Sequence, residues 1–557
     1  SRFAVGDWYM PGMHLVTINQ APTRTTSYVP DILHVQYMTR TNRPTMNVGQ
    51  PVAIGDALYA PIGAGVLVDD IGAQSALGCF IVPGQPALVQ AVGGGLTLLG
   101  TYQYCAVEVL TYRSGRTWRS PPSIPQTVVM TGTNASVQWT VRCPVLDGIF
   151  VKRTIELYRT ANNGSLFRCV NAFTAVTDSA LLITDSLADT AIVNGKLLYT
   201  HGEVATGITP RPAHVAWFGD RLWIASADFR RRLHFSKKVG GESMPEMNDI
   251  FVVELPDDAS DITQIQAMDD RLAVFTESAI YIVTGDGPDN TGAGAFPTYV
   301  KISSEVGCIV GGKSVSTGDA VYFTSLRGIQ RVWKNDQIDY VGEGVDVCFN
   351  QPQVQTPVTV LDAAFVEHLN EIRFVTANFV LVYDREFGIW YRDVGGLVTG
   401  GTLVAGCYDG DQFVLQRSNE TVYYEGSSSQ VTDNGTAFTP IIRSAWIRPG
   451  VLDQRMRLYM ARIIMTRTAG GANATPTLRI YYDNDDTLFE SFSPSAVIPG
   501  ATVLVRGSAQ PRRHRCSTFS LEARLPTSDT TVRLDAWAAE IGMKRGAFKN
   551  SAAERWV

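Results

Sequence analysis

The sequence predicts an all-β fold, and three observations lead to this prediction. Short apolar runs of strand-forming residues follow one another along the 557-residue chain, its 50 Gly and 27 Pro are spread between them as turn residues, and long helical patterns are nearly absent. Between residues 214 and 425 one pattern also recurs: a polar turn residue, an apolar strand, and a second strand beginning about eight residues later. A unit of roughly 40 to 50 residues made of short strands is typical of a β-propeller blade.

The repeated turns give the period directly. They stand 50, 49, 51 and 41 residues apart, at Asp220, Asp270, Asp319, Asn370 and Asp411. An apolar strand is expected directly after each turn, and later strands are expected at 280–283, 329–333, 380–383 and 422–424.

A sixth copy of the pattern lies near the N-terminus, where Asp56 precedes 57–59 and a second strand follows at 66–69. A propeller ring closes with strands from both chain ends, so an early copy far from the others fits ring closure. The sequence therefore predicts a six-bladed β-propeller, with residues 1–95 as N-terminal propeller strands and first blade and residues 198–430 as the main blades.

Residues 96–197 do not continue the repeated pattern and are predicted to be an inserted domain. Alternating strands are expected at 102–109, 136–141, 153–159, 167–170 and 181–184, separated by regular turn signals. About seven short strands in about 100 residues indicate an immunoglobulin-like or fibronectin-like β-sandwich. Residues 431–557 hold further strands at 457–465, 477–482, 518–525 and 531–541, either closing the propeller or forming a small sandwich.

Composition limits the possible functions. The formal net charge of −6 argues against a surface built to grip nucleic acid, because such binding relies on Lys and Arg contacts to phosphate. The eight cysteines are far apart without a CxxC pair, which indicates buried thiols of a protein made in a reducing cytoplasm, not a zinc site. No apolar run has the length of a signal peptide or a membrane span, so no membrane segment is expected.

Several motifs resemble functional sites but have structural interpretations. Residues 307–314 match the phosphate-loop pattern GxxxxGK[ST], yet a strand and a turn are expected after them, where nucleotide binding needs a helix. Segments 384–390 and 114–118 resemble the turn-plus-Trp end of an Asp box, in which the acid caps a hairpin and the Trp packs between strands. The acidic run 483–486 is interpreted as a solvated turn, with calcium binding as the alternative.

The seven histidines show no metal or catalytic spacing, and no GxSxG nucleophile elbow is present. The sequence thus gives no catalytic, cofactor-binding or metal residues, and we expect no cofactor and no enzymatic activity.

The chain resembles the tail nozzle proteins of short-tailed bacteriophages, also called tail tubular protein B or tail stabilisation protein. The resemblance rests on PAHVAWFGDRLW (212–223), DRLAVFTESAIY (270–281), EVGC (305–308) followed by YFTSLRGI (322–329), and AEIGMKRG (539–546). It is clearest over residues 200–425.

The resemblance implies a structural virion protein of the tail, made in the host cytoplasm. Its copies would associate as a ring, expected to be a homohexamer, below the portal and the head-tail adaptor. The ring would extend the DNA channel, retain the genome until ejection, and contact tail fibres or spikes, with DNA passing through without sequence-specific binding. The alternative is a tail propeller that binds or cleaves host-surface glycan.

Overall fold

The computed structural model describes most of the chain from residue 52 onward. The described residues are 52–54, 57–61, 66–70, 73–77, 85–142, 152–174, 180–198, 203–240, 243–346, 358–393, 402–408, 410, 412–418, 422–425, 432–433, 436–437, 441–448, 456–467, 477–493, 503–512, 516–524 and 532–543. The chain divides into two compact units, Ser1–Arg392 with Val404–Glu420 and Asp393–Leu403 with Thr421–Val557, and each is described by itself.

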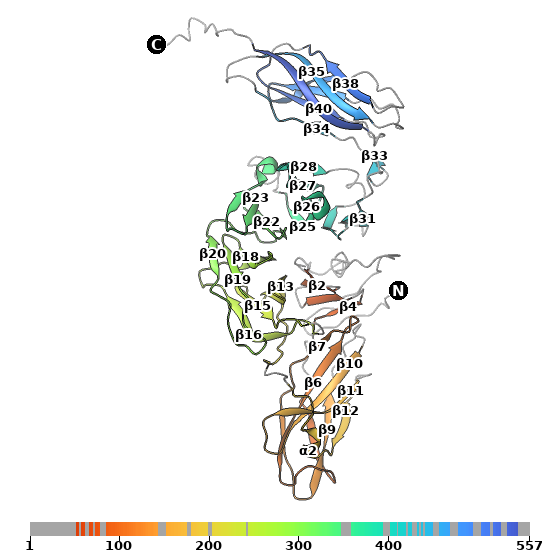
Figure 1. Ribbon diagram of the computed structural model, residues 1–557, viewed down its shortest axis with the longest axis vertical. Helices are drawn as coiled ribbons and strands as arrows, with labels where there is room; N and C mark the ends of the chain where they lie inside the picture. Colours follow the sequence, from red (N-terminus) through yellow and green to blue (C-terminus); the bar gives the residue numbers. More distant parts are fainter. Residues whose placement is uncertain are drawn as a thin grey trace. The chain divides into compact units, whose positions relative to one another are not determined.

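The predicted all-β class is confirmed, since the described part of the chain folds into small antiparallel sheets with a few short helical turns (Figure 1). Four sheets in the first unit each contain four strands paired in chain order. They are β13 (Pro212–Phe218), β14 (Arg221–Ser226), β15 (Arg232–Ser236) and β16 (Met247–Glu254); β17 (Ile262–Ala267), β18 (Arg271–Thr276), β19 (Ile280–Thr284) and β20 (Val300–Ser303); β21 (Ser314–Ser316), β22 (Ala320–Ser325), β23 (Gly328–Trp333) and β24 (Ile338–Tyr340); and β25 (Val360–Val366), β26 (Glu371–Thr376), β27 (Val380–Asp384) and β28 (Ile389–Asp393).

A similar sheet of four strands in chain order precedes them, and a strand pair follows them. The early sheet contains β1 (Val52–Ile54), β2 (Ala57–Pro61), β3 (Val66–Asp70) and β4 (Ala73–Ala76), and the late pair is β29 (Leu403–Tyr408) with β30 (Phe413–Arg417). Two single 3-10 turns also occur, η2 (Gly342–Val345) and η3 (Glu367–Leu369).

The strands expected after the repeated turns are confirmed as β14, β18, β22, β26 and β30, each the second strand of its sheet. Two of the turn residues explain the tight connections, because Asp220 and Asn370 have φ values of 58° and 55°. Asp and Asn tolerate this left-handed conformation better than other side chains. β14, β22 and β26 are buried along their whole length, which explains why apolar residues dominate them. The charged residues Glu371 and Arg373 within β26 are buried as a pair, 2.8 Å apart.

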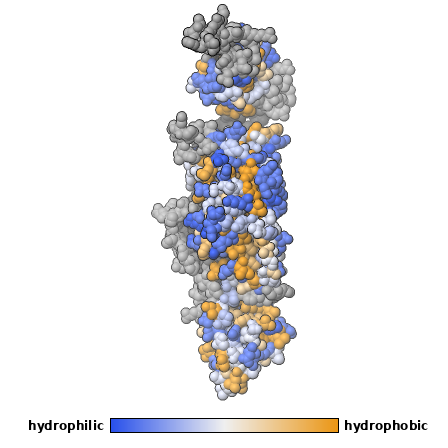
Figure 2. All heavy atoms as spheres, turned by 90° about the vertical axis from the view of Figure 1, so that its left-hand side faces the viewer, coloured by the Kyte–Doolittle hydropathy of each residue, from blue (hydrophilic) through white to orange (hydrophobic). Residues whose placement is uncertain are grey.

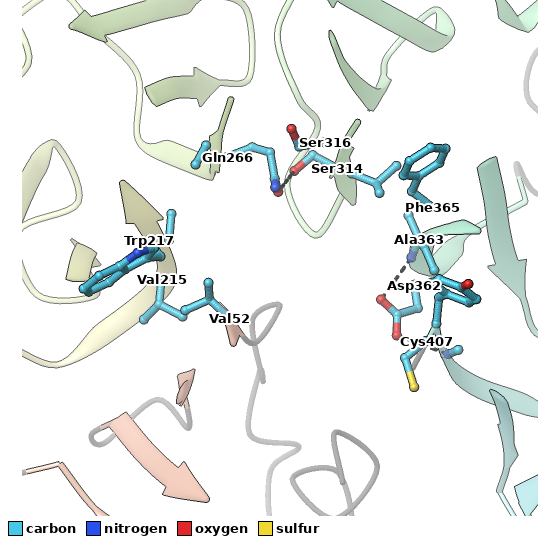
Figure 3. A pocket seen from close by; sticks show the side chains of 16 residues that line it. Val52, Val215, Trp217, Gln266, Ser314, Ser316, Asp362, Ala363, Phe365 and Cys407 are labelled. Atoms are coloured by element: carbon cyan, nitrogen blue, oxygen red, sulfur yellow. Dashed lines mark hydrogen bonds between the residues drawn. The ribbon is translucent and has the colours of Figure 1, made fainter. Parts of the chain in front are cut away.

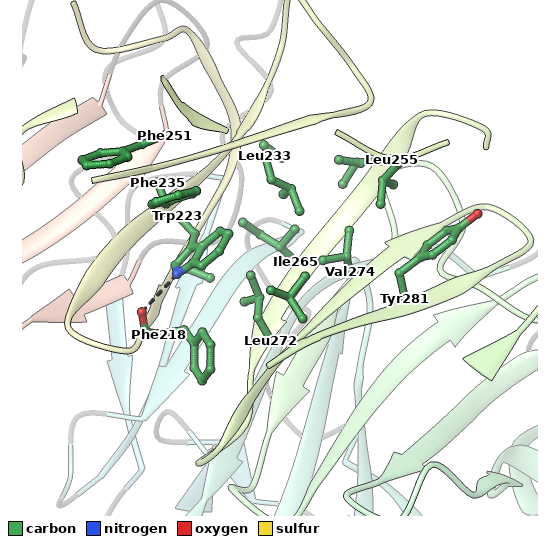
Figure 4. Packing of buried hydrophobic residues seen from close by; sticks show 14 of the residues in the cluster. Phe218, Trp223, Leu233, Phe235, Phe251, Leu255, Ile265, Leu272, Val274 and Tyr281 are labelled. Atoms are coloured by element: carbon green, nitrogen blue, oxygen red, sulfur yellow. Dashed lines mark hydrogen bonds between the residues drawn. The ribbon is translucent and has the colours of Figure 1, made fainter. Parts of the chain in front are cut away.

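Neighbouring sheets pack face to face through shared apolar clusters. One cluster joins Trp223 and Phe235 of the β13–β16 sheet to Leu272 and Tyr281 of the next sheet (Figure 4). Equivalent clusters join the β17–β20 sheet to the β21–β24 sheet, and that sheet to β25–β28. The first strands of successive sheets also lie next to one another.

Two sheets packed on a common core form an insert between β4 and β13. One contains β6 (Thr101–Thr111), β7 (Thr117–Arg119), β8 (Gln126–Val129), β10 (Lys152–Thr160) and β11 (Phe167–Thr174), and the other β5 (Ala87–Val92), β9 (Asn134–Arg142) and β12 (Ala180–Asp185). A short helix, α2 (Asp189–Ile192), follows them. β5 pairs with β9 although it lies in the range 1–95, so the insert as built begins before residue 96.

The insert is fixed to the repeated sheets by the end that carries β7. Trp118 of β7 is fully buried in a cluster with Tyr59 of β2 and Leu222 of β14. The backbone N–H of Met244 donates to the carbonyl of Thr117 at 2.8 Å. The end that carries β7 is therefore part of the core shared by the β1–β4 and β13–β16 sheets.

The second unit contains its own two-layered core. Its strands are β31 (Val422–Tyr424), β32 (Thr432–Asp433), β33 (Thr436–Ala437), β34 (Ile441–Arg443), β35 (Met456–Arg467), β36 (Thr477–Tyr482), β37 (Asp485–Phe492), β38 (Val503–Ala509), β39 (Phe519–Arg524) and β40 (Val532–Met543). The β34-β39-β36-β37 and β38-β35-β40 sheets share one apolar cluster that includes Leu458, Ile480 and Leu521. The last strands therefore form a small sandwich.

Candidate functional site

The first strands of the five four-stranded sheets in the first unit and of the β29–β30 pair line one cavity of about 380 Å³ (Figure 3). β1, β13, β17, β21, β25 and β29 each contribute residues to its wall. We call it the first-strand cavity. Its volume lies in the lower part of the range of roughly 300 to 1,000 Å³ that is usual for small-molecule pockets.

The polar groups of this cavity come from three different sheets. The Ser314 hydroxyl donates to Oε1 of Gln266 at 3.1 Å. The carboxylate of Asp362 accepts from the backbone N–H of Ala363 at 2.9 Å and of Gly406 at 3.2 Å. Asp362 is the one charged side chain among the described residues of the lining. The usual glycosidase mechanism needs two converging carboxylates, and this lining offers one.

His214 lies next to this lining, one residue before Val215 on β13. Burial lowers its pKa to about 4, the nearby Lys313 lowers it further, and a hydrogen bond with the Gln264 side chain acts in the opposite direction. The imidazole is therefore neutral at pH 7 and carries no charge next to the cavity.

A second cavity of about 590 Å³ lies between the insert and the β13–β16 sheet. Its wall contains the buried Lys237, whose Nζ is 2.9 Å from Oε2 of Glu246 and 3.7 Å from Oε2 of Glu203. Oε1 of Glu246 also accepts from the backbone N–H of Arg119 at 3.3 Å. Acidic and basic groups alternate here, so the cavity wall has no strong preference for an anion or a cation.

Arg119 extends this charged network into the insert. Its Nη2 is 2.9 Å from Oε2 of Glu156 and donates to the Tyr158 hydroxyl at 2.6 Å, and Lys196 contacts Oε1 of the same glutamate at 2.9 Å. Burial alone would raise the pKa of Glu156, but hydrogen bonds and charges of Tyr158, Arg119 and Lys196 outweigh it and lower the pKa. The network fixes the insert to the neighbouring sheet and leaves the Glu156 carboxylate ionised.

The phosphate-loop match at 307–314 is a connection between strands. β21 begins at Ser314 and no helix occurs anywhere in the described stretch 307–325. The backbone N–H groups of Ile309, Gly312 and Lys313 already donate to Thr324 O, Ile309 O and Thr324 Oγ1. A phosphate would need such N–H groups to be available, so the motif does not build a nucleotide site.

The turn of 384–390 has the predicted structural role. The Asp384 carboxylate accepts from the backbone N–H of Glu386 at 2.8 Å and of Phe387 at 3.1 Å. Trp390 packs on Tyr383 with ring centroids 4.9 Å apart and donates to the Val341 carbonyl at 2.6 Å. The acid therefore holds the hairpin and the indole packs between strands, as the sequence predicted.

In the acidic run 483–486, Asp483 and Asn484 form the turn between β36 and β37, with φ values of 56° and 59°, and the last two residues begin β37. Oδ1 of Asp483 accepts from the backbone N–H of Ser517 at 2.6 Å, and Asp486 pairs with Arg443. Within the described residues no group of three or more His, Cys, Asp or Glu gathers where it could hold a metal ion. The same part of the chain contains no helix long and apolar enough to cross a membrane.

Sequence reasoning did not find the first-strand cavity. Gln266, Ser314 and Asp362 are spaced by 48 residues. They lie in the first strands of their sheets, whereas the repeated turns predict the second strands. Equivalent positions of a repeat come together when its units surround a common space. The period of the repeat was therefore the one signal that pointed to them.

No family model matches this chain, and no curated protein matches it. Among solved structures, the computationally designed Ika4 protein covers 31% of this chain and 94% of its own, with 15% identity and a TM-score of 0.19. A chain of the mitotic checkpoint complex covers 66% of this chain and 86% of its own, with 9% identity and a TM-score of 0.27.

A third solved structure, the extracellular domain of a hybrid two-component system from B. thetaiotaomicron, covers 80% of this chain and 45% of its own. Its identity is 11% and its TM-score is 0.28. At scores this low the three likenesses carry no argument about fold or function.

Proposed function

We propose that the first unit is a six-bladed β-propeller carrying an immunoglobulin-like or fibronectin-like insert, and that the protein is a structural component of a short-tailed phage tail. Its role would be that of the tail nozzle: a ring below the portal and adaptor that extends the DNA channel, retains the genome and opens for ejection. It would act without catalysis.

One observation carries this proposal. Two of the segments on which the resemblance to tail nozzle proteins rests occupy matching places in consecutive sheets: 270–281 contains β18 and the start of β19, and 322–329 contains most of β22 and the start of β23, while 212–223 covers β13 and the start of β14 in the preceding sheet. The resemblance therefore rests on the order of these segments along consecutive four-stranded sheets. The cavity lined by six first strands supports the propeller part of the proposal, because blades arranged in a ring bring their innermost strands together.

The charge of the chain is compatible with a DNA channel. Six copies at −6 each would carry a formal charge of −36. An acidic lumen repels the phosphate backbone, so DNA would slide through without being held. A ring structure with a strongly basic channel lining would contradict this part of the proposal.

The test is electron microscopy of portal–adaptor complexes with and without the full chain. We expect an additional symmetric ring at the distal end, which would also give the copy number. Absence of added density at saturating protein would overturn the nozzle role. Release of sugar from host envelope polysaccharide by the purified chain would favour the glycan alternative, for which the single carboxylate of the first-strand cavity gives no support.

A further inference from the structure

The outward face of one sheet in the second unit combines arginine and aromatic side chains. Alternate residues of β36 and β39, among them Leu478, Ile480 and Leu521, point into the core, so the residues between them point outward. We call the outward residues of the β34-β39-β36-β37 sheet the arginine face: Ile441, Arg443, Thr477, Arg479, Tyr481, Phe489, Ser491, Ser520, Glu522 and Arg524. Figure 2 shows hydrophilic and hydrophobic residues side by side on the described part of this unit, at the top of the view.

The strand register places charged residues of this face in one row across the sheet. Arg443 of β34 is opposite Glu522 of β39, and Glu522 is opposite Arg479 of β36. Nε of Arg524 donates to Oε1 of Glu522 at 2.7 Å, and the Tyr481 hydroxyl donates to Oε2 at 2.9 Å. Both oxygens of this carboxylate therefore already accept a hydrogen bond.

Arg479 is the arginine of this face whose hydrogen-bond donors are not used within the described residues. Its Nη1 lies 3.8 Å from Oε1 of Glu522, which is too far for a hydrogen bond. Its Nε is buried without an acceptor, and its side chain is only 25% exposed. A largely buried guanidinium without acceptors costs free energy, which a bound group that supplies acceptors would recover.

Aromatic rings hold two of the arginines in place. The guanidinium carbon of Arg479 is 4.7 Å from the ring centre of Phe489, and that of Arg443 is 3.9 Å from the ring centre of Tyr481. The two rings contact each other with their centroids 5.3 Å apart. A guanidinium that is ordered before contact loses little conformational entropy on binding, and it is less strongly hydrated than an ammonium group.

The composition of the arginine face indicates a protein partner. Ile441 and Phe489, on the two edge strands of the sheet, are 51% and 41% exposed. The face also contains three arginines and no lysine. Arginine and aromatic residues are enriched in protein–protein interfaces and dominate their binding energy, whereas lysine is depleted there.

A nucleic acid or an acidic polysaccharide would fit this face less well. Its three arginines are matched by two carboxylates, Glu522 within the face and Asp486, which pairs with Arg443. The face therefore has a surplus of one positive charge, whereas polyanion binding draws its affinity from many phosphate or sulfate contacts at once. One surplus charge suits one carboxylate, and a planar guanidinium matches a carboxylate through two parallel hydrogen bonds.

We infer that the arginine face docks a protein partner, one carboxylate of which accepts two hydrogen bonds from the Nη groups of Arg479. Apolar side chains of the partner pack on Ile441 and Phe489. The partner surface is therefore acidic at its centre and apolar at its edges. This inference goes beyond the proposed nozzle role, which does not use this face and stands or falls by the electron microscopy described above.

The test is a selection from a random peptide library on the immobilised full chain, followed by fluorescence anisotropy of the enriched peptides. Arg479→Lys keeps the positive charge but cannot form two parallel hydrogen bonds with one carboxylate. Arg457→Lys is the matched control, because Arg457 is exposed and stacks on Tyr459 at 4.9 Å in the other sheet of the same unit. Equal midpoints of thermal unfolding for the two variants would show that both keep the fold.

We expect the enriched peptides to combine Asp or Glu with apolar residues, and to bind the natural chain and Arg457→Lys equally. Arg479→Lys should bind them at least about tenfold more weakly, because it loses a hydrogen bond between charged groups. Absence of enrichment, enriched peptides without Asp or Glu, or unchanged binding to Arg479→Lys would each overturn the inference. Heparin or oligodeoxythymidylate that binds more tightly than the peptides, and is released by Arg479→Lys, would also overturn it and assign the face to a polyanion.

Discussion

The insert and the repeated sheets differ in where they place their ion pairs. In the insert, Arg159 is completely buried, with Nε 2.8 Å from Oδ2 of Asp185 and Nη1 2.6 Å from Oδ1 of Asp189. Between the repeated sheets the pairs are at the surface: Arg385 with Asp319 at 2.9 Å, and Arg271 with Asp336 at 3.0 Å. In the insert a completely buried arginine joins two loop carboxylates, whereas each of these pairs between the repeated sheets contains a half-exposed carboxylate.

The comparison predicts the largest effect for Arg159→Met. It leaves Asp185 buried without its countercharge, which typically costs about 3–5 kcal/mol of unfolding free energy. Burial already raises the pKa of Asp185 in the natural chain, so the loss should be smaller near pH 4 than at pH 7, where the carboxyl is ionised. Chemical denaturation followed by circular dichroism measures it.

The double variant Arg159→Met with Asp185→Asn is the control for this prediction. It removes both charges and should recover part of the lost stability. A single variant as stable as the natural chain would show that the buried pair does not hold the insert together.

The second effect is a pH dependence located in the repeated sheets. His214 has a pKa of about 4 in the folded chain against about 6.5 unfolded, so the unfolded chain binds the proton first as pH falls. Its contribution is present above pH ~6.5 and is lost toward pH ~4. The slope is at most about 1.4 kcal/mol per pH unit because one proton is bound, and solvent screening of the partly exposed His214 makes it smaller.

Stability curves of His214→Gln should be flatter between these pH values. The pKa of His234 is also lowered by burial, so a remaining slope of the same sign is expected. Identical slopes for the variant and the natural chain would contradict the assignment to His214.

A smaller effect is expected for Asp384→Ala, which removes the acceptor of two backbone N–H groups in the hairpin between β27 and β28. Loss of a comparable capping carboxylate costs roughly 0.5–2 kcal/mol. Glu386→Ala is the control, because Glu386 is exposed in the same turn. Thermal unfolding of the two variants should show a lower midpoint for Asp384→Ala alone.

The smallest effect is expected for Arg385→Ala at the boundary between two sheets. Exposed pairs of this kind contribute about 0.2–1 kcal/mol and are screened by salt. The difference from the natural chain should shrink between low and high ionic strength in denaturant titrations. A loss that persisted in high salt would indicate that Arg385 acts through its packing over Phe365 and not through Asp319.

The sequence predicted the second strands of the sheets because an Asp or Asn turn followed by an apolar run has one structural interpretation. It also predicted the role of Asp384, since the residues that cap a hairpin are adjacent in the chain. The first-strand cavity could not be predicted, because Gln266 and Asp362 line one cavity only in the folded chain.

The core shared by the β1–β4 and β13–β16 sheets has a consequence for synthesis of the chain. β4 ends at Ala76 and β13 begins at Pro212, yet both of their sheets contribute to the cluster around Trp118. At ribosomal speeds of about 5–20 residues per second, the first sheet waits roughly 7 to 27 seconds for its partner to emerge. During this time the apolar face of the β1–β4 sheet lacks the β13–β16 sheet, so chaperones can bind it on the nascent chain.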